Sequence, residues 1–290
     1  MAGIIDIIGN TPLVEIQKLN PNPNVKIYAK LEGNNPGGSV KDRASLNMIR
    51  SAIERGDIKP GTKLIEATSG NTGIALAMIA RLFGLEIELV MPSNSTRERT
   101  LTMEAYGAKV TLLEGIELCR DYAEEKGATE GYFLLNQFAN PDNYMAHVKT
   151  TGPEIWRDTE GKITHFVSAM GTTGTIMGCS RYFKDKNKDI QIIGCQPTEG
   201  SSIPGIRRWP EAYLPKIFDA SRVDRVMDIS EAEATQMARE MAKTEGIFAG
   251  MSSGGALAAA IKLAAELKEG VIVFICCDRG DRYLSSDLFG

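Results

Sequence analysis

Lys41 lies at the start of an expected helix, where a lysine amine can be prepared for reaction with a carbonyl group. It follows a glycine-rich stretch, residues 36–40, and immediately precedes the helical pattern of residues 44–54. Ser39 is the expected N-cap, and Asp42 stands three residues later in the position of a capping box. The positive end of the helix dipole disfavours an ammonium group in the first turn and so favours the neutral amine that forms imines. On local sequence alone, a solvent-exposed lysine is the simpler interpretation.

The chain also contains three glycine-rich turns that carry serine or threonine hydroxyl groups. They are Thr68-Ser69-Gly70-Asn71-Thr72-Gly73, Gly171-Thr172-Thr173-Gly174-Thr175 and Ser252-Ser253-Gly254-Gly255. Each follows an expected strand or strand end and opens an apolar helix, so free backbone N–H groups meet the positive end of a helix dipole. Such a junction can bind a phosphate or a carboxylate. One such turn is often only tight packing, but three in one chain favour a ligand with several anionic groups.

Short apolar runs alternate with amphipathic stretches along most of the chain, which predicts a parallel sheet covered by helices on both faces. The expected strands are residues 63–67, 86–91, 109–113, 165–168, 190–195 and 271–276. The expected helices are residues 73–83, 97–106, 174–183, 232–245 and 255–267. The predicted fold class is α/β. Because ligands bind at the carboxyl edge of such sheets, the three turns are expected to meet there.

Composition and charge exclude several classes of protein. The 290 residues carry 33 basic and 37 acidic side chains, a net charge of −4, which argues against nucleic-acid and membrane-surface partners. Residues 1–10 lack the basic start of a signal peptide, and no apolar run approaches the roughly 18 residues of a membrane span. The five cysteines form no C-x-x-C pair, and with two histidines they supply a zinc site poorly. These features predict a soluble enzyme of the reducing cytoplasm, without a metal site.

Residues 250–254 match the G-x-S-x-G elbow of serine hydrolases around Ser252. That chemistry requires a histidine base that follows the serine in the chain. His147 and His165 both precede Ser252. A hydrolase is therefore a poor interpretation.

An imine-forming lysine, a phosphate cradle and a carboxylate receptor together describe one cofactor, pyridoxal phosphate. Its aldehyde would bond to Lys41 and its phosphate would occupy one turn. The carboxylate of an amino-acid substrate would occupy another turn.

Over nearly its whole length the chain resembles the β-family, fold-type II pyridoxal-phosphate enzymes, and within them the O-acetylserine sulfhydrylases, or cysteine synthases. The match to the family rests on residues 8–14 (IGNTPLV), 35–43 (NPGGSVKDR), 66–73 (EATSGNTG) and 171–175 (GTTGT). Residues 201–210 (SSIPGIRRWP) and 277–283 (CDRGDRY) favour the B form of these enzymes over the A form.

The resemblance implies two interleaved, open, twisted and mostly parallel α/β domains of the tryptophan synthase β-like type. Residues 39–147 would form a smaller mobile domain. Residues 1–38 plus 148–290 would form a larger domain that carries the phosphate site. The resemblance also implies a homodimer.

The resemblance further assigns roles to single residues. Lys41 would carry the cofactor as a Schiff base, Asn71 would hydrogen-bond its ring hydroxyl oxygen, and Ser252 would face its pyridine nitrogen. Its phosphate would be held by Gly171, Thr172, Thr173, Gly174 and Thr175. The substrate carboxylate would be received by Thr68, Ser69, Gly70, Thr72 and Gln137.

Arg207 and Arg208, beside Trp209, are the feature typical of the B form. They could draw an anionic co-substrate such as thiosulfate into the site, although a solvated surface pair accounts for them equally well. Cys277 is expected to be a small buried side chain rather than a functional thiol.

The implied reaction is a β-replacement on O-acetyl-L-serine. Lys41 would remove the α-proton, acetate would leave, and sulfide would add at the β-carbon to give L-cysteine, or thiosulfate to give S-sulfocysteine. A neutral Ser252 at the pyridine nitrogen makes the ring a weaker electron sink than a carboxylate would, which favours loss of the leaving group over transamination.

Three alternatives stay open. A cystathionine β-synthase or an O-phosphoserine-using cysteine synthase would share Lys41, Asn71 and the phosphate turn, although 290 residues do not accommodate a haem-binding or regulatory extension. A non-catalytic docking protein would bind the tail of serine acetyltransferase, a complex that residues 207–209 make unexpected. A generic α/β binding module would carry no covalent cofactor.

Overall fold

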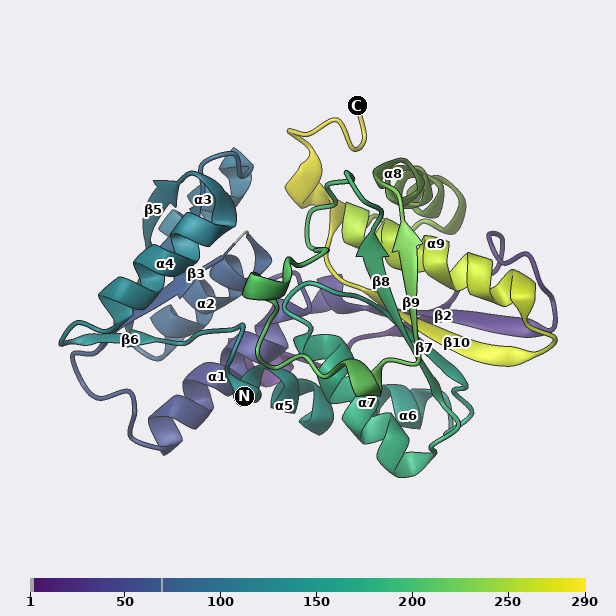
Figure 1. The fold of residues 1–290 in the computed structure, drawn as a ribbon, viewed down its shortest axis with the longest axis horizontal. Coiled ribbons are helices and arrows are strands. Elements are labelled where there is room, and N and C mark those ends of the chain that lie inside the picture. Colours follow the sequence, from purple (N-terminus) through teal and green to yellow (C-terminus); the bar gives the residue numbers. More distant parts are fainter. Residues whose placement is uncertain (1–2, 69) are drawn as a thin grey trace.

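The computed structural model describes residues 3–68 and 70–290, which form two open sheets with helices on both faces (Figure 1). The larger sheet has six strands in the order β1-β2-β10-β7-β8-β9, and the smaller sheet has four in the order β5-β4-β3-β6. Neighbouring strands are parallel except for the pair β1 and β2. The predicted α/β class with mostly parallel sheets is confirmed.

The strands of the larger sheet are β1 (Leu13–Glu15), β2 (Val25–Leu31), β7 (His165–Ala169), β8 (Gln191–Pro197), β9 (Arg225–Ile229) and β10 (Gly270–Cys276). Those of the smaller sheet are β3 (Lys63–Ala67), β4 (Glu86–Pro92), β5 (Lys109–Leu113) and β6 (Tyr132–Leu134). The α-helices are α1 (Lys41–Glu54), α2 (Asn71–Leu82), α3 (Arg97–Ala105), α4 (Gly115–Gly127), α5 (Pro141–Lys149), α6 (Thr151–Asp158), α7 (Gly174–Lys186), α8 (Glu231–Glu240) and α9 (Met251–Glu266). Short 3₁₀ helices cover Ile4–Ile7, Glu32–Asn34 (η2), Glu211–Tyr213 (η3), Ala220–Arg222 and Gly280–Tyr283, and a π-helical turn covers Met241–Glu245.

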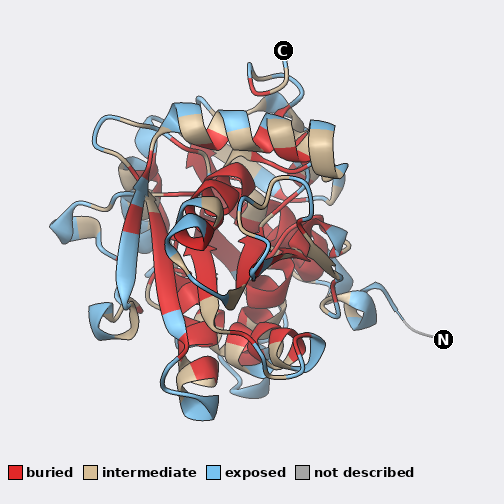
Figure 2. Ribbon diagram, turned by 90° about the vertical axis from the view of Figure 1, so that its right-hand side faces the viewer, coloured by how far each residue is buried: buried red, intermediate tan, exposed pale blue. Residues whose placement is uncertain are grey.

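An apolar core fills each side of both sheets, because successive side chains of a strand point to opposite faces. In β7, Phe166 packs with α7 on one face and Val167 packs with α9 on the other. In β3, Leu64 faces α1 and α2 while Ile65 faces α4. Figure 2 shows the resulting concentration of buried residues along the central strands and the helices that face them. The continuous apolar runs of the sequence are therefore strands that are covered on both faces.

Every expected strand and helix is present, with ends that differ by a few residues. The prediction for the third glycine-rich turn was wrong in one respect. Residues 252–255 lie inside α9, which begins at Met251 with Gly250 as its N-cap. A Cβ atom on Gly254 would overlap the backbone of α8 at Ala234. Close packing of two helices, rather than a turn, therefore requires glycine at this position.

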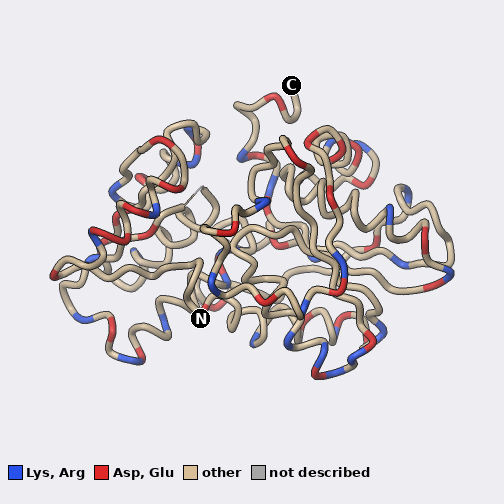
Figure 3. Tube along the Cα trace, viewed as in Figure 1, with Lys and Arg blue, Asp and Glu red and all other residues tan. Residues whose placement is uncertain are grey.

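The predicted boundary between a smaller domain of residues 39–147 and a larger one remains a prediction. Helix α5 packs on α1 and also on α7, so the elements near this boundary contact both halves of the molecule. Acidic and basic residues are interspersed along the chain (Figure 3). Across residues 3–68 and 70–290, no helix is both long and apolar enough to cross a membrane.

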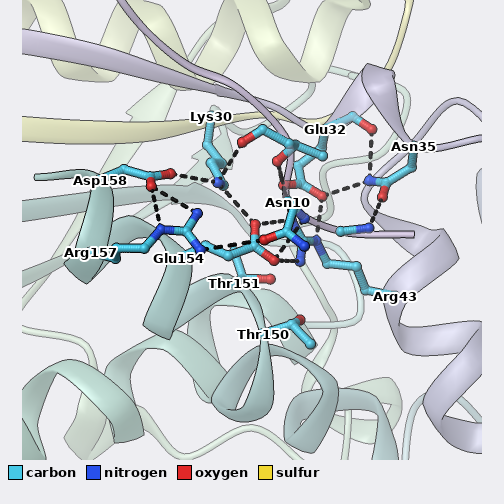
Figure 4. A network of polar contacts seen from close by, with 12 residues as sticks. Asn10, Lys30, Glu32, Asn35, Arg43, Thr150, Thr151, Glu154, Arg157 and Asp158 are labelled. Atoms are coloured by element: carbon cyan, nitrogen blue, oxygen red, sulfur yellow. Dashed lines mark hydrogen bonds and ion pairs between the residues drawn. The ribbon is translucent and has the colours of Figure 1, made fainter. Parts of the chain in front are cut away.

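A buried network of charges joins the start of α1 to the larger sheet (Figure 4). Arg43 is 3% exposed; its Nε donates to Glu32 Oε2 and its Nη1 donates to Glu154 Oε1, both at 2.7 Å. Lys30, which is fully buried on β2, lies 2.9 Å from Glu154 Oε2 and 3.2 Å from Asp158 Oδ2. The network thereby ties β2, η2, α1 and α6 together.

The electrostatics of this network favour the charged forms. Burial alone would raise the pKa of Glu154, but the hydrogen bonds and charge of Arg43, together with Lys30, lower it from 4.5 to about 2. Because the pKa of the folded state lies below that of the unfolded state, the stabilisation is complete above about pH 4.5. It is lost as the pH falls towards 2.

We expect Arg43→Met to destabilise the protein by about 3–5 kcal/mol, since it removes the cation beside the buried Glu32 carboxylate and one of the two cations beside Glu154. The measurement is urea unfolding followed by circular dichroism. The same variant should lose much of the stability change that the parent protein shows between pH 5 and pH 3.

The matched control is Arg225→Ala. Arg225 pairs with Glu266 on the surface, where both side chains are about half exposed, and such pairs contribute at most about 1 kcal/mol. Equal losses of stability in the two variants would contradict the importance given to the buried network.

Candidate active site

A cavity of about 210 Å³ lies at the carboxyl ends of the strands, between the two sheets. Its walls come from residues that directly follow β3, β4, β7 and β10. Nine of the predicted site residues line it: Lys41, Asn71, Thr72, Gln137, Gly171, Thr172, Thr175, Arg207 and Ser252. Thr68, Gly70, Thr173, Gly174 and Arg208 do not line it, and Ser69 lies outside the described residues. The expected convergence at one edge is therefore observed for the first two turns and for Ser252.

Lys41 is the first residue of α1 and is half-buried in the cavity wall. Its backbone N–H donates to Ser39 Oγ at 3.2 Å. The predicted capping box is wrong, because the N-cap is Val40 and the Asp42 carboxylate instead accepts from the backbone N–H of Gly37. Burial raises the pKa of Asp42 to about 7, against the opposing effects of the Gly37 hydrogen bond and the Arg282 charge.

The loop between β7 and α7 has the features of a phosphate cradle. Thr173, the N-cap of α7, has φ of 70°, a conformation that costs energy for a residue with a side chain. A Cβ atom on Gly171 would lie 2.8 Å from the Gly205 carbonyl oxygen, and one on Gly174 would overlap Asn143. Thr173 Oγ1 is buried without a hydrogen-bond partner within the described part of the chain. A helix N-terminus with an unused hydroxyl group suits the phosphate of the cofactor.

His147 lies beneath this loop and was missed as a site residue by sequence reasoning. Its Nδ1 is 2.8 Å from Thr151 Oγ1, and its Nε2 is 3.4 Å from Thr175 Oγ1. Burial, followed by the charges of Arg43 and Lys41, holds the pKa of His147 well below its usual value. The imidazole is therefore neutral and orients the Thr175 hydroxyl group without adding charge.

Both ends of the Asn71 side-chain amide are held by the C-terminal segment. Its Nδ2 donates to Asp278 Oδ2 at 2.7 Å, and its Oδ1 accepts from Arg282 Nη1 at 2.6 Å. Tyr283 also donates to Asp278 Oδ2, at 2.7 Å. One proton on Asn71 Nδ2 remains for an acceptor in the cavity. Sequence reasoning used residues 277–283 only to assign the enzyme form and missed this support.

Gln137 is held in place by hydrogen bonds from three directions. Its Nε2 donates to the Ala67 carbonyl group at 2.7 Å, and its Oε1 accepts from Thr72 Oγ1 at 2.8 Å. Its backbone N–H donates to Glu66 Oε1 at 3.3 Å. Burial raises the pKa of Glu66 to about 8, so this carboxyl group is neutral at pH 7. Thr68 Oγ1 accepts from the N–H groups of residues 70 and 73 and so shapes the adjoining turn.

One buried amide joins the receptor at Gln137 to the phosphate cradle. Asn143 Nδ2 donates to the Gln137 carbonyl group at 2.8 Å and to Thr172 Oγ1 at 3.1 Å. Asn143 lies on α5 and is 2% exposed. It therefore contacts both expected binding sites without lining the cavity itself.

The two adjacent arginines point in different directions. Arg207 lines the cavity, and burial lowers the pKa of its guanidinium group. Arg208 turns away, with Nη2 2.7 Å from Asp228 Oδ1 and Nε donating to the Pro197 carbonyl group. Of these two arginines, only Arg207 is placed to contact a ligand in the cavity.

Ser252 and Cys277 both line the cavity. Ser252 is 3% exposed, in the first turn of α9. Cys277 lines the cavity, and burial raises the pKa of its thiol to about 11, so the thiol is protonated at neutral pH. Such a thiol is a poor nucleophile, in line with the small structural role expected for it.

Comparison with known proteins places the chain in a family. A model described as pyridoxal-phosphate dependent enzyme matches residues 4–278. The chain belongs to this family of pyridoxal-phosphate-dependent enzymes, so the predicted cofactor class is confirmed.

The particular relatives agree with the sequence resemblance. Cysteine synthase B from Pseudomonas aeruginosa is 58% identical over 289 residues, 99% of this chain and 97% of the relative. The crystal structure of O-ureido-L-serine synthase superposes with a TM-score of 0.94 at 36% identity, over 100% of this chain and 95% of the other. That of O-acetyl serine sulfhydrylase isoform 3 from Entamoeba histolytica superposes with a TM-score of 0.92 at 40% identity, over 100% and 91%. The resemblance to the B form of cysteine synthase is confirmed.

We expect Asn143→Ala to weaken binding of pyridoxal phosphate and of the amino-acid substrate together, by about fivefold each, since each lost hydrogen bond contributes about 1 kcal/mol. The measurements are absorbance titration of the apoenzyme with the cofactor and the KM of the amino-acid substrate. Asn47→Ala is the control, because Asn47 makes a similar amide-to-carbonyl bond, to Asp142 at 2.7 Å, outside the site. A loss confined to one of the two ligands would contradict the bridging role.

Proposed function

We propose that this protein makes L-cysteine from O-acetyl-L-serine and sulfide, with pyridoxal phosphate bound to Lys41. The observation that carries the proposal is the meeting of Lys41, the loop after β7 and the Gln137 receptor in one cavity. It stands in a chain that is 58% identical to a cysteine synthase B. The fold alone would not fix the added nucleophile, because O-ureido-L-serine synthase shares it.

We assign the cofactor contacts as follows. Residues 171–175 would hold the phosphate through backbone N–H groups and hydroxyl groups, Asn71 would donate to the ring hydroxyl oxygen, and Ser252 would face the ring nitrogen. Bound pyridoxal phosphate supplies an aldehyde for imine formation and a conjugated ring that withdraws electrons from the α-carbon of an amino acid. The unused Thr173 hydroxyl group and the remaining proton of Asn71 support this assignment.

The protein's own residues then position the substrate and move its proton. The turn after β3, with Thr68, residues 69 and 70, and Thr72, would receive the substrate carboxylate together with Gln137. Lys41 would take the α-proton on its Nζ as acetate leaves the β-carbon. Ser252 brings no negative charge to the ring nitrogen, which favours loss of the leaving group over transamination.

We also propose a domain closure, a contact for the sulfur donor and an oligomeric state. Residues 39–147 would close as a smaller domain over the substrate carboxylate and exclude water. Arg207, rather than Arg208, would meet an anionic sulfur donor such as thiosulfate. We further infer a cytoplasmic homodimer that does not bind serine acetyltransferase, to be checked by light scattering and by a pull-down with the tail peptide of that enzyme.

We expect Lys41→Ala to abolish turnover and the visible absorbance of the covalently bound cofactor, while the far-ultraviolet circular dichroism stays unchanged. In the parent protein, borohydride reduction followed by proteolysis should leave the cofactor mass on the peptide that contains Lys41. Lys149→Ala, which alters an exposed lysine on α5, should keep the absorbance and the activity. Cofactor mass on another lysine would refute the assignment.

We expect a donor panel to single out O-acetylserine, so that only this compound, and neither O-phosphoserine nor serine, changes the cofactor spectrum quickly. An efficient reaction of serine with homocysteine would mean a cystathionine β-synthase instead.

Among the sulfur acceptors, we expect Arg207→Ala to lower kcat/KM for thiosulfate at least about tenfold, as expected for losing a charged hydrogen bond. Arg208→Ala should change it less than about twofold, because an exposed pair with Asp228 contributes little.

A further inference from the structure

Trp209 pins the segment that follows β8 to the phosphate cradle. Its Nε1 donates to the Gly171 carbonyl group at 2.7 Å, and the backbone N–H of Arg207 donates to the Met170 carbonyl group at 2.9 Å. The Trp209 ring also meets Phe138 edge to face, with centroids 5.6 Å apart. Arg207 is therefore directed into the cavity from a short stretch of chain that is fixed at both ends.

Arg120 reaches this stretch from the other sheet. It lies on α4, which packs on β3, β4 and β6 of the smaller sheet. Its Cζ lies 4.4 Å from the ring centroid of Phe138, 5.8 Å from that of Trp209 and 5.3 Å from that of Tyr213. Its Nη1 also donates to the Tyr213 carbonyl group at 3.0 Å. We call Arg120, Phe138, Trp209 and Tyr213 the aromatic clasp.

The chemistry of the clasp is specific to arginine. A planar guanidinium group can face aromatic rings and donate in its own plane to a carbonyl group at the same time, whereas an ammonium group acts as a compact point charge. Two features make the clasp a link between the halves of the site. Phe138 directly follows Gln137, and the Trp209 ring is bonded to the cradle. In Figure 1, the short helix η3, which ends at Tyr213, lies between the two sheets.

We propose that Arg120 is a positioning residue that holds residues 207–213 across the cavity and thereby keeps Arg207 directed towards the incoming nucleophile. Loss of Arg120 would affect only those acceptors that the Arg207 guanidinium group binds, which are anions larger than sulfide. The inference rests on the proposed function, because it concerns which nucleophile reaches the β-carbon. Arg120 itself does not line the cavity, so it would act through Arg207.

The kinetic test compares thiosulfate with sulfide as the acceptor. Arg120→Ala should lower kcat/KM for thiosulfate about tenfold, mainly through KM, and that for sulfide less than about twofold, as a cation–π contact and one hydrogen bond are lost. Arg120→Lys should fall between the parent and the alanine variant. Arg120→Ala combined with Arg207→Ala should match Arg207→Ala alone, since both changes remove the same contact. If the losses of kcat/KM for thiosulfate caused by the two substitutions multiplied in the double variant, the proposal would be overturned.

A second readout is independent of turnover. The chain has two tryptophans, Trp156 and Trp209, so the Trp156→Phe background leaves Trp209 as the only tryptophan, and it can be excited selectively at wavelengths that tyrosine does not absorb. Adding Arg120→Ala should shift the emission to longer wavelength, because Trp209 loses part of its cover. Unchanged emission would overturn the proposal, whatever the kinetics.

Arg181→Ala is the matched control. The Arg181 Cζ lies 4.1 Å from the ring centroid of Tyr144, and its Nη1 donates to the Met177 carbonyl group, so it loses the same two kinds of contact away from the cavity. It should change neither the ratio of the two acceptors nor the Trp209 emission. Equal shifts in both variants would indicate a general loss of stability and overturn the proposal.

Failure of the proposed function gives a different pattern. A parent enzyme that uses neither acceptor would refute the synthase, and the Trp209 emission would still decide whether Arg120 holds the segment. A parent enzyme that uses sulfide but not thiosulfate would keep the synthase and overturn the role of the clasp in selecting the acceptor.

Discussion

Burying an arginine side chain costs several kcal/mol of desolvation free energy, which ion pairs with carboxylates can offset. Arg43 forms ion pairs with two carboxylates, those of Glu32 and Glu154. Glu32 comes from η2, which directly follows β2, and Glu154 comes from α6, so the cation fixes the distance between these two elements. Arg43 stands two residues after Lys41 in the first turn of α1. The place of the lysine is therefore set by a charge pair that takes no part in the reaction. A looser anchor would let α1 turn and move the amine out of the cavity.

The remaining site is assembled between the two sheets, and the side-chain amide groups of Asn71 and Asn143 supply several of the hydrogen bonds that hold it. Asn71 lies on α2, but its side chain is hydrogen-bonded to Asp278 and Arg282 of the C-terminal segment. Amides are suited to this task because they donate and accept at once and carry no net charge. Motion of one sheet against the other, if it accompanies substrate binding, must strain or exchange these bonds.

Sequence reasoning reached the alternating strands and helices because parallel strands that are buried on both faces leave continuous apolar runs. It also reached Lys41 and the loop after β7, since glycine and hydroxyl residues at the start of a helix are typical of anion-binding sites. The supports of the site could not be found in this way. His147 and Asp278 lie far along the chain from Thr175 and Asn71, which they orient, and no local pattern links them. Asn143 is close in sequence to Gln137, but its bond to Thr172 spans 29 residues.

The orientations that the sequence did not reveal have the same physical origin. Asp42 matched a capping box in spacing, but tertiary contact with Gly37 drew its carboxylate elsewhere. Arg207 and Arg208 are indistinguishable as neighbours in a sequence, whereas Asp228 on β9 selects one of them and turns it outward. Short-range patterns thus identify the reactive groups, and long-range packing decides which way they face.

The single amide of Asn143 has a thermodynamic consequence. Asn143 bonds to the Gln137 carbonyl group and to Thr172 at once. A ligand that orders the phosphate cradle at Thr172 therefore also favours the ordered position of Gln137, and the reverse. Coupling free energy is reciprocal, so whatever factor the cofactor adds to substrate affinity the substrate must add to cofactor affinity. An enzyme kept saturated with its amino-acid donor would then release its cofactor more slowly than a resting one. Supply of substrate would in this way protect the loaded form of the catalyst.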